Sequence, residues 1–531
     1  MREILFQYES VNPTTWAYLS SLLMIGLFFK FNRLWSVRNL DLLLIILLAP
    51  GMLMVYFGSR NAAEQAVLNA PTVIEIEGEN PIPVEPERSI TEELGGSDLK
   101  EGPNGVNLKQ VVPLEGPEAN ADGVEPEADE SLALATGEAE NTVAISDTLE
   151  KTGYVWLFIV SALWIIRLLI DPTMVRRPLL EPNLTTGGMA FISCAMFLFL
   201  MSNIIVSRPS AADLRGMREI EKMRTAETSE EVEEILKHYG PGYALFLYLP
   251  RLPTTQFAQP EASAEREEDR IIVGTAKTMA ILTNLALVVG LALIGYRHFD
   301  NVKMGIGAGM LYQMLPYTAL YAGRIDHALP AALLIWAVLC YRRPFWAGIF
   351  LGLAIGTVYY PLFLLPLWVS FYWQRGVSRF TMGIAAMLVL LALSLAITAP
   401  DFNSFIQQLR AMFGLWMPRN ERFTGFWSFY FSSNAFRVPI LTLFVAFSGG
   451  LALWPAQKNL GTLLSCSAAV MLGAQFWHAN DGATFLAWYV PLMLLTIFRP
   501  NLEDRVALHV IGEGWKPRTK RSPETSEKKA A

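Results

Sequence analysis

One short turn of the sequence brings together three residue types that carry charge and move protons. In Gly323-Arg324-Ile325-Asp326-His327, a guanidinium, a carboxyl group and an imidazole fall between two apolar stretches. Ionisable side chains close to membrane depth are functional candidates, because an unpaired charge is costly to keep there. The alternative is an exposed ion pair between Arg324 and Asp326 in a short loop. The sequence leaves both interpretations open.

A second polar region, residues 399–437, places arginines among Phe, Trp and Tyr side chains. Arginine forks suit phosphate, and aromatic rings suit either a sugar face or the membrane interface. The other interpretation is an amphipathic helix at the membrane surface, and both stay open. The charged residues of this region are Asp401, Arg410, Arg419, Glu421, Arg422 and Arg437. Further on, His478 and Asp481 are more typical of a helix cap than of a catalytic pair.

The sequence lacks the common cofactor motifs. It contains neither the phosphate loop G-x-x-x-x-G-K-[ST] nor the zinc motif H-E-x-x-H. The five histidines are scattered and give no zinc spacing. No Asp-x-Asp signature appears either, so a nucleotide-sugar donor bound through such a metal motif is not expected. We expect no cofactor and leave a divalent cation open.

The composition of the 531-residue chain is that of a membrane protein. Hydrophobic residues make up 52% and charged residues 17%, whereas soluble domains average about 25% charged. The three cysteines all lie in apolar runs, so no disulfide framework is expected. The acid-bearing first residues do not resemble a cleavable signal. We predict an all-α membrane protein with about 12–13 transmembrane helices, each long enough for a ~30 Å hydrocarbon layer, at 15–30, 40–57, 154–170, 187–207, 272–296, 304–322, 327–341, 345–373, 380–398, 438–455, 459–477 and 482–498.

Lysine and arginine alone predict which loops share a side of the membrane. Basic residues in short loops mark the cytoplasmic side. Loops around Lys30, Arg176, Arg297, Arg342, Arg375 and Lys458 and the tail from Arg499 are basic. The loops 208–271, 323–326, 399–437 and 478–481 then lie outside. The segment 345–373 is basic at both ends, so we predict two half-helices folded back at Thr357–Tyr360, a broken element of the kind that needs protein or water around it.

The chain divides into four parts by composition. Residues 1–57 form an N-terminal transmembrane pair, 58–152 an acidic insert, 153–498 the multi-pass core with outer loop 208–271, and 499–531 a basic cytoplasmic tail. Between residues 61 and 150 there are 21 acidic and three basic residues and no aromatic one. Such a composition buries too little apolar surface to fold alone, so we predict a disordered extracytoplasmic insert with short strand-like pieces near Val73-Ile74.

The long outer loop carries helical signals. Leu214, Met217, Ile220 and Met223 form one apolar stripe, and Thr228 with Glu231 matches a capping box. Gly240 stands where a helix-ending glycine belongs. These features predict amphipathic helices along the membrane surface, or a helical connector that holds no site.

Three motifs in a fixed order carry a family resemblance. The first is Tyr239-Gly240-Pro241-Gly242-Tyr243, the second is the Gly323–His327 turn, and the third joins Arg342-Arg343-Pro344 and Ala347-Gly348 to Tyr359-Tyr360-Pro361. From Tyr239 to Trp368 the chain resembles the GT-C class of integral-membrane glycosyltransferases. It is most similar to glycosyltransferase family 87, the polyprenyl-phosphate-mannose-dependent mannosyltransferases. Departures from the family pattern are Gly240 for a proline, Arg324 for a glutamine and Val358 for a lysine.

The resemblance implies a site and a reaction. Family members keep a catalytic Asp just outside the first core span, which here is Asp213 after span 187–207. The implied reaction moves a sugar, mannose or a related hexose, from a polyprenyl-phosphate donor to an extracytoplasmic glycan or lipid acceptor. The implied donor-phosphate contacts are Arg215, Arg251, Arg324 and His327, and the implied substrate contacts are Tyr239, Asp326 and Tyr360.

The expected setting is the cytoplasmic membrane of a cell envelope, with the site and the acidic insert extracytoplasmic and the C-terminus cytoplasmic. The partners are then the lipid-linked sugar, the acceptor and the bilayer, with no nucleic acid, and the oligomeric state is open. Two other classes stay open from the residues: a membrane transporter, which also uses broken helices, and a non-catalytic scaffold. Convergence of Asp213, Arg324 and His327 on one outer cavity would separate the enzyme from the scaffold.

Overall fold

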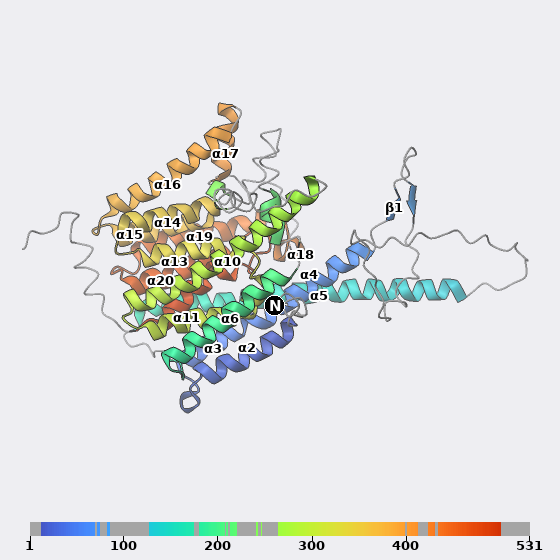
Figure 1. The fold of residues 1–531 in the computed structure, drawn as a ribbon, viewed down its shortest axis with the longest axis horizontal. Coiled ribbons are helices and arrows are strands. Elements are labelled where there is room, and N and C mark those ends of the chain that lie inside the picture. Colours follow the sequence, from blue (N-terminus) through green and yellow to red (C-terminus); the bar gives the residue numbers. More distant parts are fainter. Residues whose placement is uncertain are drawn as a thin grey trace, which may run out of the picture. The chain divides into compact units, whose positions relative to one another are not determined.

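The computed structural model describes most of the chain between residues 12 and 500. The described residues are 12–68, 72–74, 82–84, 127–174, 180–207, 209–210, 213–219, 240–242, 246, 264–398, 401–412, 423–430 and 434–500. The chain separates into two compact units, residues 54–152 and the remainder. The larger unit is a bundle of helices in which the labelled helices α6, α10, α11, α13, α14 and α16 lie in neighbouring layers (Figure 1).

The helices reproduce the predicted apolar stretches. Their bounds are α2 Pro13–Phe28, α3 Val37–Ile46, α4 Leu48–Leu68, α5 Glu127–Ile170, α6 Thr186–Val206, α10 Ala264–His298, α11 Val302–Met314, α12 Pro316–Tyr321, α13 Ile325–Leu339, α14 Pro344–Thr357, α15 Leu365–Tyr372, α16 Val377–Thr398, α17 Phe402–Met412, α18 Phe426–Tyr430, α19 Arg437–Leu453, α20 Leu460–Ala474 and α21 Val490–Phe498. Short 3-10 turns add η1 Phe31–Arg33, η2 Asp171–Thr173, η3 Tyr360–Leu364, η4 Asn434–Phe436 and η5 Leu486–Trp488.

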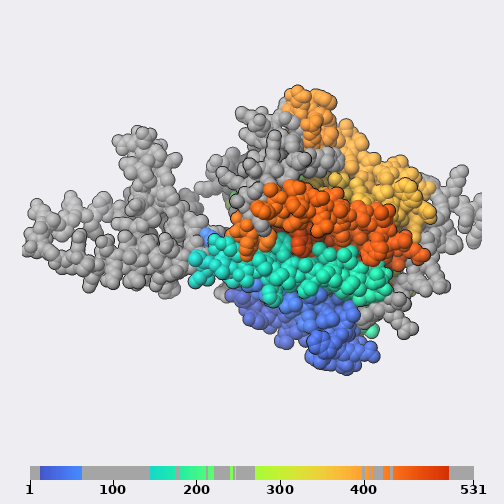
Figure 2. Space-filling model, turned by 180° about the vertical axis from the view of Figure 1, so that it is seen from behind, coloured from blue at the N-terminus to red at the C-terminus, as the bar shows by residue number. Residues whose placement is uncertain are grey.

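Length and composition confirm an all-α multi-pass membrane protein. Among the described residues, five helical stretches are long and apolar enough to cross a bilayer, and shorter apolar helices fill the space between them. The long ones are Val37–Ala62, Ala144–Thr173, Thr186–Val206, Arg270–His298 and Val377–Ala396. Figure 2 shows the N-terminal helices, the α5 segment and the C-terminal helices side by side on one face of the bundle.

The acidic insert is described only at its edges and at one hairpin. Helix α4 continues to Leu68 and helix α5 begins at Glu127, so helix reaches further into the insert than its composition suggested. Both edges are rich in Ala, Glu and Leu, which are strong helix formers. Strands β1 Thr72–Ile74 and β2 Ile82–Val84 pair antiparallel with Val73 opposite Pro83. The predicted disorder of residues 85–126 lies outside the described residues.

The described parts of the predicted basic loops gather at one end of the bundle, which we call the basic end; Arg176 and the tail after residue 500 lie outside the described residues. A chain of contacts joins them in space. Arg38 donates to the carbonyl of Glu181 at 2.8 Å, and Lys303 pairs with the Glu181 carboxylate at 3.8 Å. Further contacts are His298 to the Leu339 carbonyl, Tyr372 to the Tyr341 carbonyl, Arg375 to the Lys458 carbonyl, and Arg499 against Gly461.

The described parts of the loops predicted to lie outside gather at the opposite end, which we call the pocket end. Gly240 N–H donates to the carbonyl of Thr357 at 3.0 Å, and Asp481 N–H donates to that of Thr424 at 3.3 Å. Trp488 donates its indole N–H to the carbonyl of Asp326 at 3.1 Å. For the described parts of these loops, the grouping predicted from lysine and arginine is the grouping that the folded bundle shows.

The element predicted to fold back on itself does so. Helix α14 runs parallel to α16, since Gly348 lies against Phe380, Gly352 against Ile384 and Met387, and Gly356 against Leu391. Small residues every fourth position let two helices approach closely in this way. After the break at Val358 and Tyr359, α15 returns, because Tyr372 packs on Phe380 with ring centroids 4.6 Å apart and donates to the Tyr341 carbonyl. Both ends of the element thus lie at the basic end.

Two predicted spans are less regular than the sequence indicated. Span 304–322 is interrupted between α11 and α12, where Pro316 starts the second piece. Span 482–498 is wrong in its first half: only Val490–Phe498 is α-helix, preceded by η5. Asp481 and Ala483 adopt positive φ angles of 51° and 77°, a conformation that a helix does not accept. Residues 482–490 are nonetheless buried, as irregular backbone in a membrane bundle must be.

Candidate functional site

Asp213 lies in the first turn of a helix whose described residues are 213–219, and it is held by Ser210, the residue that caps this helix. Ser210 donates both its backbone N–H (2.9 Å) and its hydroxyl (2.8 Å) to Asp213 Oδ2. In return, Asp213 N–H donates to Ser210 Oγ at 3.2 Å. This reciprocal pattern is a capping box. It fixes one carboxylate oxygen and leaves the other, Oδ1, for a different partner.

Oδ1 of Asp213 faces the turn of the Gly323–His327 motif. A Cβ built on Gly323 would lie 3.1 Å from Oδ1 and 3.2 Å from the carboxylate carbon. The missing side chain of Gly323 is therefore what lets the carboxylate approach this turn. Asn284 on α10 secures the turn by donating to the Ala322 carbonyl at 3.0 Å. The predicted catalytic residue and the second family motif thus meet, although 110 residues separate them in the chain.

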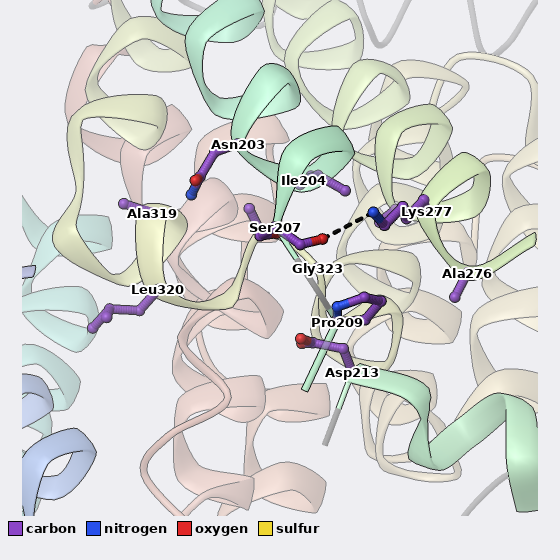
Figure 3. A pocket seen from close by; sticks show the side chains of 12 residues that line it. Asn203, Ile204, Ser207, Pro209, Asp213, Ala276, Lys277, Ala319, Leu320 and Gly323 are labelled. Carbon is purple, nitrogen blue, oxygen red and sulfur yellow. Dashed lines mark hydrogen bonds between the residues drawn. The ribbon is translucent and has the colours of Figure 1, made fainter. Parts of the chain in front are cut away.

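A pocket opens beside this carboxylate (Figure 3). Its cavity volume is about 90 Å³, room for several water molecules at ~10–15 Å³ of such volume for each. The wall comes from the end of α6, the start of the 213–219 helix, α10 and the α12–α13 turn. The lining residues are Asn203, Ile204, Ser207, Pro209, Asp213, Ala276, Lys277, Ala280, Ala319, Leu320, Ala322 and Gly323.

Arg324 and Asp326 form a buried bidentate ion pair. Arg324 Nε lies 3.0 Å from Asp326 Oδ1, and its Nη2 lies 2.7 Å from Oδ2. Each side chain is only 12% exposed, so the exposed ion pair considered from the sequence is not what forms. The pair joins Arg324, the N-cap residue of α13, to Asp326 in the first turn of that helix.

His327 is buried in a cluster of rings. Its Nδ1 lies 2.7 Å from the hydroxyl of Tyr317. Tyr321 stacks on the imidazole with centroids 5.1 Å apart, and Phe485 packs at 4.4 Å. His327 therefore joins the Gly323–His327 turn to the irregular segment before α21.

Tyr360 stands at the fold-back point and continues the same aromatic cluster. It stacks on His478 at 4.7 Å and packs against Trp488 at 5.2 Å. The His478 Nδ1 accepts the N–H of Asn480 at 3.1 Å; this bond lies in a turn, so His478 does not cap a helix as the sequence suggested. Arg324, Asp326, His327 and Tyr360 thus lie in one connected region at the pocket end, next to the pocket rather than in its wall.

The glycine turn at residues 240–242 packs on the fold-back point from the other side. A Cβ on Gly240 would collide with the carbonyl oxygen of Gly356, and one on Gly242 would lie 2.9 Å from it. Glycine at both positions is required by this close approach of two backbones. The first and third family motifs therefore meet at the end of α14.

The remaining predicted contacts lie away from the pocket wall or outside the described residues. Arg215 is described and exposed. Tyr239 and Arg251 lie outside the described residues, as do Arg419, Glu421 and Arg422 of the region 399–437.

The described part of that region has structural contacts. Arg437 donates to the carbonyl of Trp477 at 2.8 Å, and this bond joins two segments of the pocket end. The segment at 402–412 is indeed a helix, α17, capped by Asp401 through Ser404 N–H at 2.8 Å. The two hydrogen bonds from Ser404 lower the pKa of Asp401.

Within the part of the chain that the structure describes, no group of three or more His, Cys, Asp or Glu side chains lies close enough together to hold a metal ion. The described site comprises the Asp213 carboxylate and the Lys277 ammonium in a small pocket, a tight turn beside them and an aromatic cluster behind that turn.

Residues 238–498 match the model of glycosyltransferase family 87. This confirms the resemblance inferred from the motifs. The match covers the Gly323–His327 turn, the fold-back element and the C-terminal helices, and it begins after Asp213. Glycosyl transfer is the activity that membership of this family implies. No curated protein and no solved structure matches the chain.

Sequence reasoning missed two residues of the pocket. Asn203 and Lys277 both lie within long apolar spans. A polar residue near the end of an apolar span, at about the depth of the suspected Asp213, was the available signal. The Ser210-Ala-Ala-Asp213 capping pattern was also readable in the sequence.

Proposed function

We propose that this protein transfers a sugar, mannose or a related hexose, from a polyprenyl-phosphate donor to an extracytoplasmic glycan or lipid acceptor. The observation that carries the proposal is the position of Asp213. Its carboxylate lines a pocket at the end of the bundle, faces a turn within the family-matched region, and has one oxygen fixed by Ser210. A positioned carboxylate beside a pocket is the geometry of a general base.

The proposed step couples a proton transfer to substitution at the anomeric carbon. Asp213 Oδ1 takes the proton of an acceptor hydroxyl, and that oxygen forms a bond to the anomeric carbon of the sugar. The bond between the anomeric carbon and the phosphate oxygen breaks, and its electron pair stays with the polyprenyl phosphate. The leaving group gains one negative charge, and the proton on Asp213 is later released to water.

The remaining predicted residues have supporting places in this proposal. Arg324 and His327 adjoin the pocket and already have partners, so a phosphate contact from either would add to those partners. Asp326 and Tyr360 build the region behind the turn. Arg215, exposed on the 213–219 helix, is the described arginine best placed to meet a lipid phosphate approaching along the surface.

The proposed setting is the cytoplasmic membrane, with the pocket end extracytoplasmic and the C-terminus cytoplasmic. Support comes from the charge distribution. The basic loops gather at the opposite end of the bundle, and an excess of lysine and arginine marks cytoplasmic loops.

The test measures transfer by the purified protein in liposomes that contain radiolabelled polyprenyl-phosphate mannose. Asp213→Asn should lower transfer by ~10²–10⁴-fold, the usual contribution of a positioned base. Asn keeps the shape of the side chain, so the unfolding temperature should change little. The matched control is Asp401→Asn, which changes a carboxylate of the same end that only caps α17.

Equal transfer by Asp213→Asn and wild type would refute the assigned base. Wild-type protein that is folded and transfers from no polyprenyl-phosphate sugar to any acceptor offered would refute the donor class, and it would favour the scaffold alternative.

A further inference from the structure

Lys277 is the cation in the described wall of the pocket. It lies on α10, seven residues after Arg270, which places it roughly 10 Å further along the helix axis at 1.5 Å per residue. Its neighbours in the wall are the small residues Ala276 and Ala280. In Figure 3 the Lys277 side chain reaches from α10 toward Ser207, above Pro209 and Asp213.

The ammonium is held in place by two backbone carbonyls. Lys277 Nζ donates to the carbonyl oxygen of Ile205 at 2.7 Å and to that of Ser207 at 2.9 Å. An ammonium group has three N–H donors. Within the described part of the chain, the third donor meets no acceptor. The group is therefore fixed in position with one donor still available.

The charge of Lys277 is not cancelled by the carboxylate in the same pocket. None of the ion pairs between described residues joins Lys277 to Asp213. Asp213 is held by Ser210, and Lys277 is held by the end of α6. The pocket thus presents one anionic and one cationic group from different elements, with otherwise uncharged residues between them.

We propose that Lys277 binds the phosphate group of the polyprenyl-phosphate donor and stabilises it as the leaving group. This rests on the proposed function, since it names the residue that meets the donor's phosphate at the same site. In the donor the phosphate diester carries one negative charge, and after the bond to the sugar breaks the monoester carries two. A fixed ammonium that needs no rearrangement stabilises such developing charge best.

The competing explanation is that Lys277 only closes the end of α6. Lysine side chains commonly donate to the last carbonyls of a helix. That role predicts a loss of stability when the lysine is replaced, and no dependence on the charge of the lipid. A phosphate-binding role predicts little loss of stability and an affinity that depends on the charge of the lipid.

The first experiment measures binding of C55 polyprenyl monophosphate, neutral polyprenol of the same length and inorganic phosphate to the protein in nanodiscs. Lys277→Gln keeps amide N–H donors for the α6 carbonyls and removes the charge. It should weaken binding of the polyprenyl monophosphate at least tenfold, because hydrogen bonds to charged groups contribute more than neutral ones. Binding of the neutral polyprenol should stay unchanged.

The matched control is Lys303→Gln at the basic end. Lys303 is also a lysine with a polar partner, the Glu181 carboxylate, so replacing it should leave all three affinities as in the wild type. Unchanged binding of the polyprenyl monophosphate by folded Lys277→Gln would overturn the proposal. Inorganic phosphate that binds as tightly as the lipid would overturn the lipid assignment.

A second measurement uses the wild-type chain and does not depend on a stable variant. Amine acetylation of Lys277, followed by peptide mass spectrometry, should slow when polyprenyl monophosphate is bound. Neutral polyprenol should give no protection, and Lys303 serves as the internal reference. Equal labelling of Lys277 with and without the lipid phosphate would overturn the proposal.

These outcomes are separate from those of the transfer assay. Lipid-phosphate binding that depends on Lys277 supports this inference even if no acceptor yields transfer. Transfer that depends on Asp213, together with lipid binding that ignores Lys277, supports the proposed function and overturns this inference alone.

Discussion

The two ends of the bundle use charged residues in opposite ways. At the basic end, Arg38 donates to the carbonyls of Phe28 and Glu181. Arg167 forms ion pairs with two carboxylates, those of Asp41 (2.6 and 2.8 Å) and Asp171 (3.4 Å). At the pocket end, Asp213 and Lys277 are each fixed through part of their hydrogen-bonding capacity and keep the rest. Charges of the first kind hold helices together, whereas those of the second kind are the ones to which we assign a ligand.

The largest effect should come from breaking the charge cluster of the basic end. Arg167→Met leaves Asp41 and Asp171 buried without their cation; the two carboxylate side chains are 3% and 0% exposed. Removing one partner of a buried ion pair costs about 3–5 kcal/mol. The expected result is a much lower unfolding temperature in detergent, with unchanged transfer per folded molecule.

The control for that prediction is Lys303→Met, whose pair with the half-exposed Glu181 contributes little. A variant Arg167→Met that unfolds like the wild type would show that the cluster does not hold α3 to α5, and the contrast between the two ends would fail.

A smaller and functional effect is expected at the turn beside Asp213. Gly323→Ala places a methyl group 3.1 Å from Oδ1, so the carboxylate must shift by a few tenths of an ångström. Small displacements of a catalytic group lower the rate of the reaction strongly. Transfer should fall by about tenfold while the unfolding temperature stays nearly constant.

Gly449→Ala is the matched control, because a Cβ there meets nothing within 4 Å. Equal losses of transfer in the two alanine variants would show that the Asp213–Gly323 contact plays no part in the reaction.

The smallest effect should follow the loss of the cap on Asp213. Ser210→Ala removes the hydroxyl that donates to Oδ2 and costs roughly 1 kcal/mol of local helix stability. Hydrogen exchange at 213–219 should speed up, and transfer should fall less than in Asp213→Asn. Ser210→Thr keeps the hydroxyl, so hydrogen exchange at 213–219 and transfer should match the wild type. If Ser210→Ala changes neither the exchange nor the transfer, Asp213 is positioned by something else.

Much of the fold could be predicted because its signals are local. Apolar length gives the spans, and lysine and arginine in short loops say which loops share an end. The break at Thr357–Tyr360 followed from charge at both ends of one apolar segment. In contrast, residues 482–489 are as apolar as a transmembrane helix, and only their backbone conformation in the packed bundle shows that they do not form one.

The site was harder to predict because it depends on contacts between distant segments. The family resemblance pointed to Asp213, but nothing in the sequence says that its carboxylate rests on Gly323. Arg324 was expected to be available for phosphate, yet an aspartate two residues later holds it. Lys277 could not be predicted as a pocket residue because its partners are backbone carbonyls at the end of α6, which no residue pattern reveals.

The fold-back of α14 and α15 also bears on how the chain enters the bilayer. Both ends of this hairpin lie at the basic end, so it adds no net crossing. Helices from α16 onward therefore take the same orientation whether or not the hairpin has already been inserted. The orientation of the C-terminal helices is thus independent of the insertion of the segment that carries Tyr360.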